Sequence, residues 1–197
     1  INDIPENFAI LVGLYNISLY AVIQFGSPKD FNLCGICKQC ITAIGKGNNL
    51  LTGEKDIELN KIARSYKSQN KGWLVIGDEN IGEGSSREHA AMEPRHMAGR
   101  AFVAKSYARI FEANLKKQGV LALTFSNKAD YDKIQEKDKV TLENLDKLTP
   151  GQPVSMTVAH EDGSKESLSL THTMNQEEIQ WFIAGSALNF VGEQRRK

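Results

Sequence analysis

The stretch WLVIGDENIGEGSSREH (residues 73–89) joins a short apolar run, a glycine-rich loop and the start of a helix. The apolar run ends at Gly77, a pattern typical of a strand that is buried on both faces of a sheet. Ser85 and Glu88 have the spacing of a capping box, which predicts that a helix starts here. We expect Pro94 to limit this helix. The residues expected to face inward are Ala90, Ala91 and Met92.

Downstream of this stretch, apolar runs alternate with a helical pattern. Residues 101–104 and 120–125 predict two more buried strands. Residues 107–118 predict a helix between them, and Gly119 closes it. Strands and helices in this order imply a parallel sheet with crossover helices. The predicted fold class is therefore α/β.

The last third of the chain follows a different pattern. Residues 154–160 and 167–173 flank a polar turn with a glycine, which predicts a hairpin. A C-terminal helix is expected over residues 176–191, with Asn175 and Glu178 at its start. The residues expected on its apolar face are Ile179, Phe182, Ile183, Ala187 and Leu188.

The N-terminal part is less regular. Residues 54–69 carry the apolar spacing of a helix. Residues 26–53 are rich in glycine and predict a loop or linker. Residues 8–25 are apolar, and their periodicity fits a strand or a buried helix equally well. We therefore divide the chain into a divergent N-terminal segment or linker, residues 1–53, and one domain, residues 54–197.

Composition narrows the function classes. Lys plus Arg and Asp plus Glu both number 24, so neither nucleic acid nor an anionic membrane is expected as a bulk electrostatic partner. No apolar run approaches the roughly 20 residues of a membrane helix. Three cysteines are an odd number, which argues against a secreted disulfide scaffold. The first residue, Ile1, favours a fragment or a processed product, and no signal or transit peptide is evident.

The glycine-rich loop has the residue types of an anion site. Gly82 and Gly84 permit a close approach of the backbone to a ligand, and a helix start favours an anion. Arg87 adds a planar fork that suits a carboxylate. The hydroxyls of Ser85 and Ser86 can position a hydroxy acid or exchange a proton with it. The alternative is a glycine turn with a serine cap and a surface arginine, without a ligand.

Three long runs resemble the C-terminal part of mitochondrial-type aconitases. These runs are GDENIGEGSSREHAAMEPRH (77–96), KSYARIFEANLKKQGVLALTF (105–125) and LTHTMNQEEIQWFIAGSALN (170–189). The resemblance is dense over residues 54–197, and Ile81 stands where the family typically has an aromatic residue.

The resemblance implies a swivelling domain that closes over a [4Fe–4S] cluster, whose ligands lie in upstream domains outside this chain. It implies that Ser85 is the catalytic base and that Ser86 and Arg87 bind a substrate carboxylate. It also implies the interconversion of citrate and isocitrate through cis-aconitate, in the tricarboxylic acid cycle of the mitochondrial matrix. The isolated chain is expected to be inactive, because dehydration needs a Lewis acid that these residues do not supply.

Residues 1–53 depart from the family. Residues 14–18 resemble a short family stretch that follows a substrate-binding arginine, and Leu11 stands at that arginine's place. Since residues 1–53 contain no arginine, a shifted alignment does not recover it. The loss of this contact puts intact substrate binding in question.

Cys34, Cys37 and Cys40 have no family counterpart. Thiolates at this spacing can ligate zinc or an iron–sulfur cluster, which makes the three cysteines candidate metal ligands. No fourth ligand is evident nearby, and a divergent segment without a metal is the competing interpretation.

Two other functions stay open at this stage. A truncated, non-catalytic binding or scaffold protein fits the missing arginine and the unmatched cysteines. The small subunit of an isopropylmalate-type isomerase fits the chain length, and the long aconitase-like runs argue against it.

Overall fold

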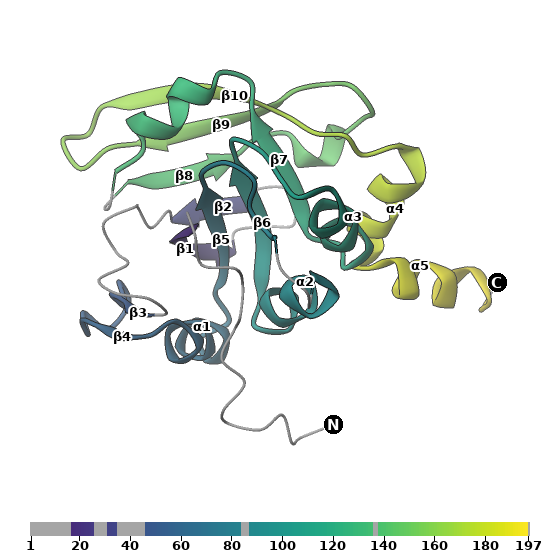
Figure 1. Cartoon of the computed structure of the whole chain (residues 1–197), viewed down its shortest axis with the longest axis horizontal. Helices are drawn as coiled ribbons and strands as arrows, with labels where there is room; N and C mark the ends of the chain where they lie inside the picture. Colours follow the sequence, from purple (N-terminus) through teal and green to yellow (C-terminus); the bar gives the residue numbers. More distant parts are fainter. Residues whose placement is uncertain (1–16, 26–30, 35–45, 84–86, 136–137, 197) are drawn as a thin grey trace.

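The computed structural model describes residues 17–25, 31–34, 46–83, 87–135 and 138–196 (Figure 1). Its strands are β1 (Ile17–Phe25), β2 (Phe31–Cys34), β3 (Lys46–Gly47), β4 (Ile57–Glu58), β5 (Gly72–Gly77), β6 (Gly99–Ala104), β7 (Leu121–Phe125), β8 (Lys139–Leu142), β9 (Val154–Ala159) and β10 (Lys165–Thr171). Its α-helices are α1 (Leu59–Ser68), α2 (Arg87–His96), α3 (Arg109–Lys117), α4 (Gln176–Ala184) and α5 (Ala187–Gln194). Two 3₁₀ helices, η2 (Lys128–Lys133) and η3 (Leu145–Lys147), flank β8.

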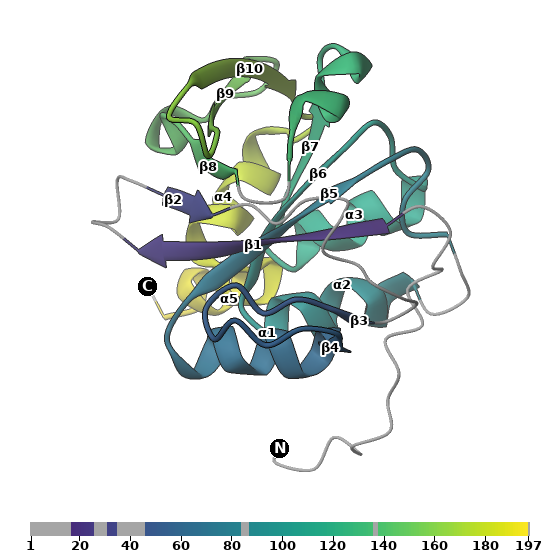
Figure 2. The same ribbon diagram turned by 90° about the vertical axis from the view of Figure 1, so that its left-hand side faces the viewer.

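Eight strands close into a barrel in the order β1-β2-β8-β9-β10-β7-β6-β5. β5, β6 and β7 run parallel, and α2 and α3 are the crossover helices between them. The other neighbouring strands of the barrel pair antiparallel, as Figure 2 shows for β1 and β2. The predicted α/β fold with parallel strands, crossover helices and a hairpin is confirmed. The hairpin β9–β10 joins the same sheet because β10 pairs with β7.

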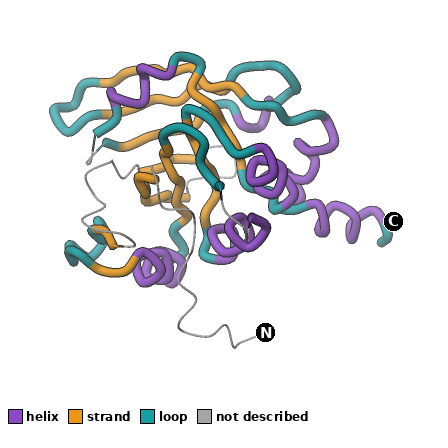
Figure 3. The backbone as a smooth tube through the Cα atoms, viewed as in Figure 1, coloured by secondary structure: helices purple, strands orange, loops and turns teal. Residues whose placement is uncertain are grey.

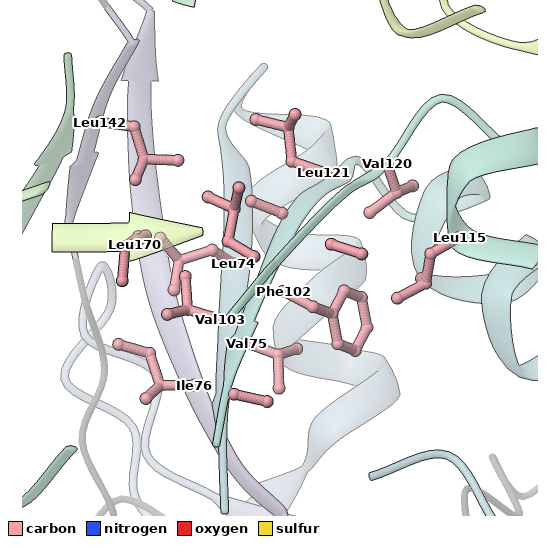
Figure 4. Packing of buried hydrophobic residues seen from close by; sticks show 14 of the residues in the cluster. Leu74, Val75, Ile76, Phe102, Val103, Leu115, Val120, Leu121, Leu142 and Leu170 are labelled. Carbon is pink, nitrogen blue, oxygen red and sulfur yellow. The ribbon is translucent and has the colours of Figure 1, made fainter. Parts of the chain in front are cut away.

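The parallel strands form the centre of the hydrophobic core. Every residue of β5 is buried, as predicted for a strand that is covered on both faces. In Figure 4 the side chains of these strands lie between two leucines of the antiparallel strands, Leu142 and Leu170, and Leu115 of α3. The core therefore spans both the barrel interior and the layer between barrel and helices.

The crossover helices pack against each other outside the barrel (Figure 3). In α2, Ala90 and Ala91 are buried as predicted. The prediction that Met92 faces inward is wrong, because this residue is 42% exposed. Pro94 does not end α2, which continues to His96. A proline near the end of a helix removes only one hydrogen bond, and tertiary contacts can make up for its loss.

The C-terminal helix is two helices rather than one. Gly185 adopts a left-handed conformation with φ of +89°, which ends α4 and turns the chain into α5. The predicted capping box of Asn175 and Glu178 is present at the start of α4. The prediction of a single buried apolar face is wrong, because Ile183 and Leu188 are 68% and 82% exposed while Ile179 is buried.

The N-terminal part contains more strand than predicted. Residues 17–25 adopt the strand alternative, and β2 and β3 lie within residues 26–53, where a loop was expected. The helix predicted over residues 54–69 begins only at Leu59, because the two preceding residues pair with β3. The predicted domain boundary after residue 53 falls between β3 and β4, and that division stays a prediction. Among the described residues, no helix combines the length and hydrophobicity that a membrane span requires.

Candidate functional site

The predicted site lies where the parallel strands end. The loop of residues 78–83 follows β5, and residues 105–108 follow β6. Since β5 and β6 are parallel neighbours, both loops leave the barrel at the same edge. This is the edge at which ligands bind in open α/β sheets.

Backbone hydrogen bonds join the two loops. The Ile81 amide donates to the Ser106 carbonyl at 3.1 Å, and the Ala108 amide donates to the Ile81 carbonyl at 2.9 Å. The Asn80 amide donates to the Ser106 hydroxyl at 2.8 Å. Ile81 is only 1% exposed, so its side chain anchors the loop in the core. The loop that leads to α2 is therefore held by its own backbone.

Tyr107 anchors the second loop to the third parallel strand. Its hydroxyl donates to the Leu123 carbonyl at 2.8 Å. Burial raises the pKa of Tyr107 well above its ordinary value, so the phenol stays a neutral donor. Both loops are thus anchored to the core, the first through the Ile81 side chain and the second through Tyr107.

Two glycines shape the loop after β5. A Cβ at Gly77 would lie 2.7 Å from Ile81 Cγ2, so glycine permits the loop to fold back on the strand. Gly82 has φ of +88°, and a Cβ there would lie 2.1 Å from Phe111 Cγ on α3. The close neighbour of Gly82 in this structure is therefore an aromatic ring of the core. The proposed role of Gly82 in supporting the loop rests on this packing.

The acidic residues of the loop pair with lysines from other segments. The Asp78 carboxylate lies 2.9 Å from Lys105 Nζ, which also lies 4.3 Å from the centre of the Tyr131 ring. The hydrogen bond to Asp78 raises the pKa of Lys105. Glu79 pairs with Lys128 at 2.8 Å on the surface. Sequence reasoning missed Lys105, although a lone cation directly after a buried strand was a usable signal.

The central candidate residues follow this loop directly. Gly84, Ser85 and Ser86 lie outside the described residues, as does the side chain of Arg87. The backbone of Arg87 is the first residue of α2, so a helix starts where the capping box predicted it. A helix start has amide groups without helical partners, which are able to bind an anion. The roles assigned to Ser85, Ser86 and Arg87 stay predictions.

The candidate metal ligands are not brought together within the described residues. Cys34 is the last residue of β2, and Cys37 and Cys40 lie outside the described part of the chain, as does Leu11. Across the described ranges, no group of three His, Cys, Asp or Glu residues could hold a metal ion. The described residues therefore do not provide a ligand set for a [4Fe–4S] cluster.

The chain resembles proteins of one family along most of its length. The sequence profile of the "Aconitase C-terminal domain" matches residues 17–128. The mitochondrial aconitate hydratase of Gracilaria gracilis is 58% identical over 148 residues, which are 75% of this chain and 19% of that protein. The mitochondrial aconitate hydratase of Saccharomyces cerevisiae is 52% identical over 150 residues, which are 76% of this chain and 19% of that protein. The matched part thus spans about a fifth of the length of these relatives.

Solved structures also match this chain. The 3-isopropylmalate dehydratase of Methanocaldococcus jannaschii is 24% identical, with a TM-score of 0.48, over 62% of this chain and 65% of that one. A likeness of this strength decides nothing about substrate. The profile match and the identities of about 50% decide the family: this chain belongs to the aconitase C-terminal domain family.

Proposed function

We propose that this chain forms the carboxylate-binding face of an aconitate hydratase, which interconverts citrate and isocitrate through cis-aconitate. The observation that carries the proposal is the braced loop 78–83, which delivers the start of α2 to the carboxyl edge of the parallel strands. Relatives that match three quarters of this chain are named mitochondrial aconitate hydratases, which supports the same reaction and the mitochondrial matrix as its place.

Within this proposal Arg87 binds one substrate carboxylate. A guanidinium forms two parallel hydrogen bonds with a carboxylate, and the free amides of the helix start add to the positive potential. The Ser86 hydroxyl donates to the same carboxylate. One carboxylate of a tricarboxylate is therefore held at one end of a single helix.

Ser85 is the proposed base. In the dehydration direction its oxygen accepts the proton from the substrate carbon, while the C–O bond breaks on the neighbouring carbon and a double bond forms. A serine oxygen acts as a base only where positive groups stabilise its anion, and Arg87 with the helix start supplies them.

The departing hydroxyl needs a Lewis acid, which is the chemistry that a [4Fe–4S] cluster would supply. The resemblance to the family supports our assignment of the cluster to polypeptide upstream of this domain, and the described residues offer no ligand set for one. The relatives contain several times more chain than the part matched here, which supports upstream aconitase domains as the partner. We expect the isolated chain to bind a tricarboxylate without dehydrating it.

Calorimetric titration with tricarballylate, a non-reactive tricarboxylate, tests the proposal. We expect saturable binding that Arg87→Ala weakens by roughly 10- to 100-fold, the usual worth of charge-assisted hydrogen bonds. Ser85→Ala should bind like the unaltered chain. Arg64→Ala is the matched control, because Arg64 is exposed on α1. No binding, or binding that Arg87→Ala leaves unchanged, would contradict the proposal.

The partner is tested by the native mass of the polypeptide that contains residues 77–96. A mass several times 21.9 kDa, with upstream peptides that contain cysteines, supports the multidomain enzyme. A native chain of that small mass favours the second candidate, a non-catalytic binding or scaffold protein. The residue that favours this second candidate is Leu11, at the place of a family arginine.

A further inference from the structure

Residues near the ends of three helices meet beside the C-terminal helical pair. Arg95 is the second-last residue of α2, Gly119 follows the end of α3, and Gly185 ends α4. In Figure 1 the helices lie next to one another, and α3 packs against α2, α4 and α5. The Gly185 carbonyl oxygen is the atom that the Arg95 side chain and the backbone of Gly119 both approach.

The contacts at this carbonyl are close. Arg95 Nη2 donates to the Gly185 carbonyl oxygen at 2.9 Å. A Cβ at Gly119 would lie 2.3 Å from the same oxygen, so the α3 end touches it with bare backbone. Asn189 Nδ2 donates to the Ala184 carbonyl at 3.0 Å from the α5 side. Two side chains thus satisfy carbonyls that the end of α4 leaves without helical partners.

Arg95 is the cation that lies at this point. The C-terminal end of a helix carries a partial negative charge, and the Arg95 guanidinium lies at the C-terminal end of α4. The other basic residues nearby have different contacts: Lys116 Nζ donates to the Thr173 carbonyl at 3.1 Å and lies 3.5 Å from Glu178. The half-buried Arg95 guanidinium therefore stabilises the arrangement both by charge and by its hydrogen bond.

The last turn of α2 depends on such a contact. Pro94 lies inside α2 and has no amide hydrogen, so one helical hydrogen bond is absent just before Arg95. On the sheet side a Cβ at Gly99 would lie 2.8 Å from the Pro94 carbonyl, so this turn rests directly on the start of β6. From the same turn, the Arg95 side chain reaches the α4–α5 turn.

We propose that Arg95 is a positioning residue, which ties α2 to the α4–α5 turn and so sets the placement of the helix start that carries Arg87. This inference rests on the proposed function, since it assigns a role to that same helix start. Eight residues of helix span about 12 Å, so a tilt at Arg95 displaces the substrate-binding end. Arg95 itself does not touch substrate.

Residue-resolved amide hydrogen exchange of the 197-residue chain tests the coupling without any ligand. In Arg95→Gln we expect exchange to rise roughly tenfold or more at residues 91–93, which close the first turns of α2, and at residues 184–190. Arg95→Lys retains a cation and should restore most of the protection. Arg64→Gln, the exposed control, should change neither region. A rise confined to residues 184–190 would overturn the proposal, because Arg95 would then be a local cap only.

Tricarballylate affinity supplies the second readout, measured well below the unfolding temperature of each variant. Arg95→Gln should weaken binding several-fold with partial rescue by Arg95→Lys, and should add nothing in an Arg87→Ala background. Unchanged affinity in Arg95→Gln would overturn the inference. If the unaltered chain does not bind, the proposed function fails, and the exchange pattern still decides whether Arg95 places the start of α2.

Discussion

The parallel and antiparallel halves of the barrel are stabilised in different ways. The parallel half, β5–β7 with α2 and α3, is buried on both faces, and its loops are joined by backbone hydrogen bonds. The antiparallel half, β8–β10, buries alternate residues and exposes the others. Its outer side chains form exposed or half-buried ion pairs, such as Lys133 with Glu166 at 3.4 Å.

The two halves of the barrel therefore have different roles. The parallel half carries the candidate site, and small changes in packing there reach the start of α2. The antiparallel half completes the barrel, and its turns and surface pairs tolerate change. The same type of substitution should therefore cost more in the parallel half than in the antiparallel half.

The largest expected effect comes from Gly82→Ala. A Cβ there would lie 2.1 Å from Phe111 Cγ, and φ of +88° disfavours any side chain. Overpacking and the left-handed conformation together should lower the free energy of unfolding by roughly 2–5 kcal/mol. Urea unfolding measures it.

Gly163→Ala is the matched control in the β9–β10 turn. Gly163 has nearly the same φ, +86°, and nothing lies within 4 Å of a Cβ there. Its cost should be only about 1 kcal/mol, the conformational part alone. Equal losses in the two variants would show that packing against Phe111 contributes nothing.

The next effect compares two lysines that each contact more than one partner. Lys116 on α3 is buried and lies 3.7 Å from Glu112 and 3.5 Å from Glu178. Lys116→Met leaves these carboxylates without their cation and should cost roughly 1–3 kcal/mol. Lys133→Met, in the exposed network beside the hairpin, should have little measurable effect. Thermal unfolding of both variants distinguishes them, and a larger loss for Lys133→Met would refute the contrast.

A smaller effect is expected for the ion pairs of the loop itself. Asp78→Asn removes the partner of Lys105, whose side chain is 17% exposed, and should cost about 0.5–1 kcal/mol. Glu79→Gln removes the partner of Lys128, where both side chains are more than half exposed, and should be nearly neutral. Urea titrations at low and high salt should show the first loss persisting and any second loss vanishing.

The smallest expected effects are changes of the free energy of unfolding with pH, which come from two histidines at the ends of the hairpin strands. His160 Nδ1 lies 2.9 Å from Asp138 Oδ2, and that hydrogen bond, with help from Glu166 and Asp162, raises the pKa of His160. Its stabilisation is complete below the ordinary value of 6.5 and is lost as pH rises through the higher folded pKa. In His160→Gln, the urea concentration at the unfolding midpoint should depend less on pH above pH 6.5. A slope that persists in this variant must have another source.

His172 gives the opposite slope. Burial, and to a smaller degree the positive Lys116, lowers the pKa of His172, so the unfolded chain binds the proton more readily. Stability should therefore decline as pH falls below 6.5 toward the folded pKa. His172→Gln should weaken this decline between about pH 5.5 and 6.5, a window above most carboxyl titrations. An unchanged slope would assign the decline to other groups.

Local patterns predicted the parallel half well. The apolar run before Gly77 predicted β5, and outside this half the spacing of Asn175 and Glu178 predicted the start of α4. Both depend on neighbours in sequence. The prediction failed for β2, a strand of four residues whose partners are β1 and the distant β8. The amino-acid composition of such a short segment does not predict pairing with a strand that is distant in sequence.

The candidate site shows the same division. Gly82 was selected because glycine permits a close approach of the backbone to a ligand, while its left-handed conformation and its neighbour Phe111 on α3 became evident only in the fold. Lys105 and Arg95 were not selected as site residues, because each contacts a partner that is remote in sequence. Ser85, Ser86 and Arg87 were selected by residue type and by resemblance.

Local periodicity, capping chemistry and long runs of matching residues were enough to predict the family, the α/β class, the parallel strands and the place where α2 starts. Three features became evident only in the folded chain: the strands close into one barrel, Gly185 divides the last helix, and Arg95 joins two helices that are distant in sequence at one carbonyl. Such features depend on which atoms meet after the chain folds. A hydrogen bond between residues 90 positions apart leaves no local signal in the sequence.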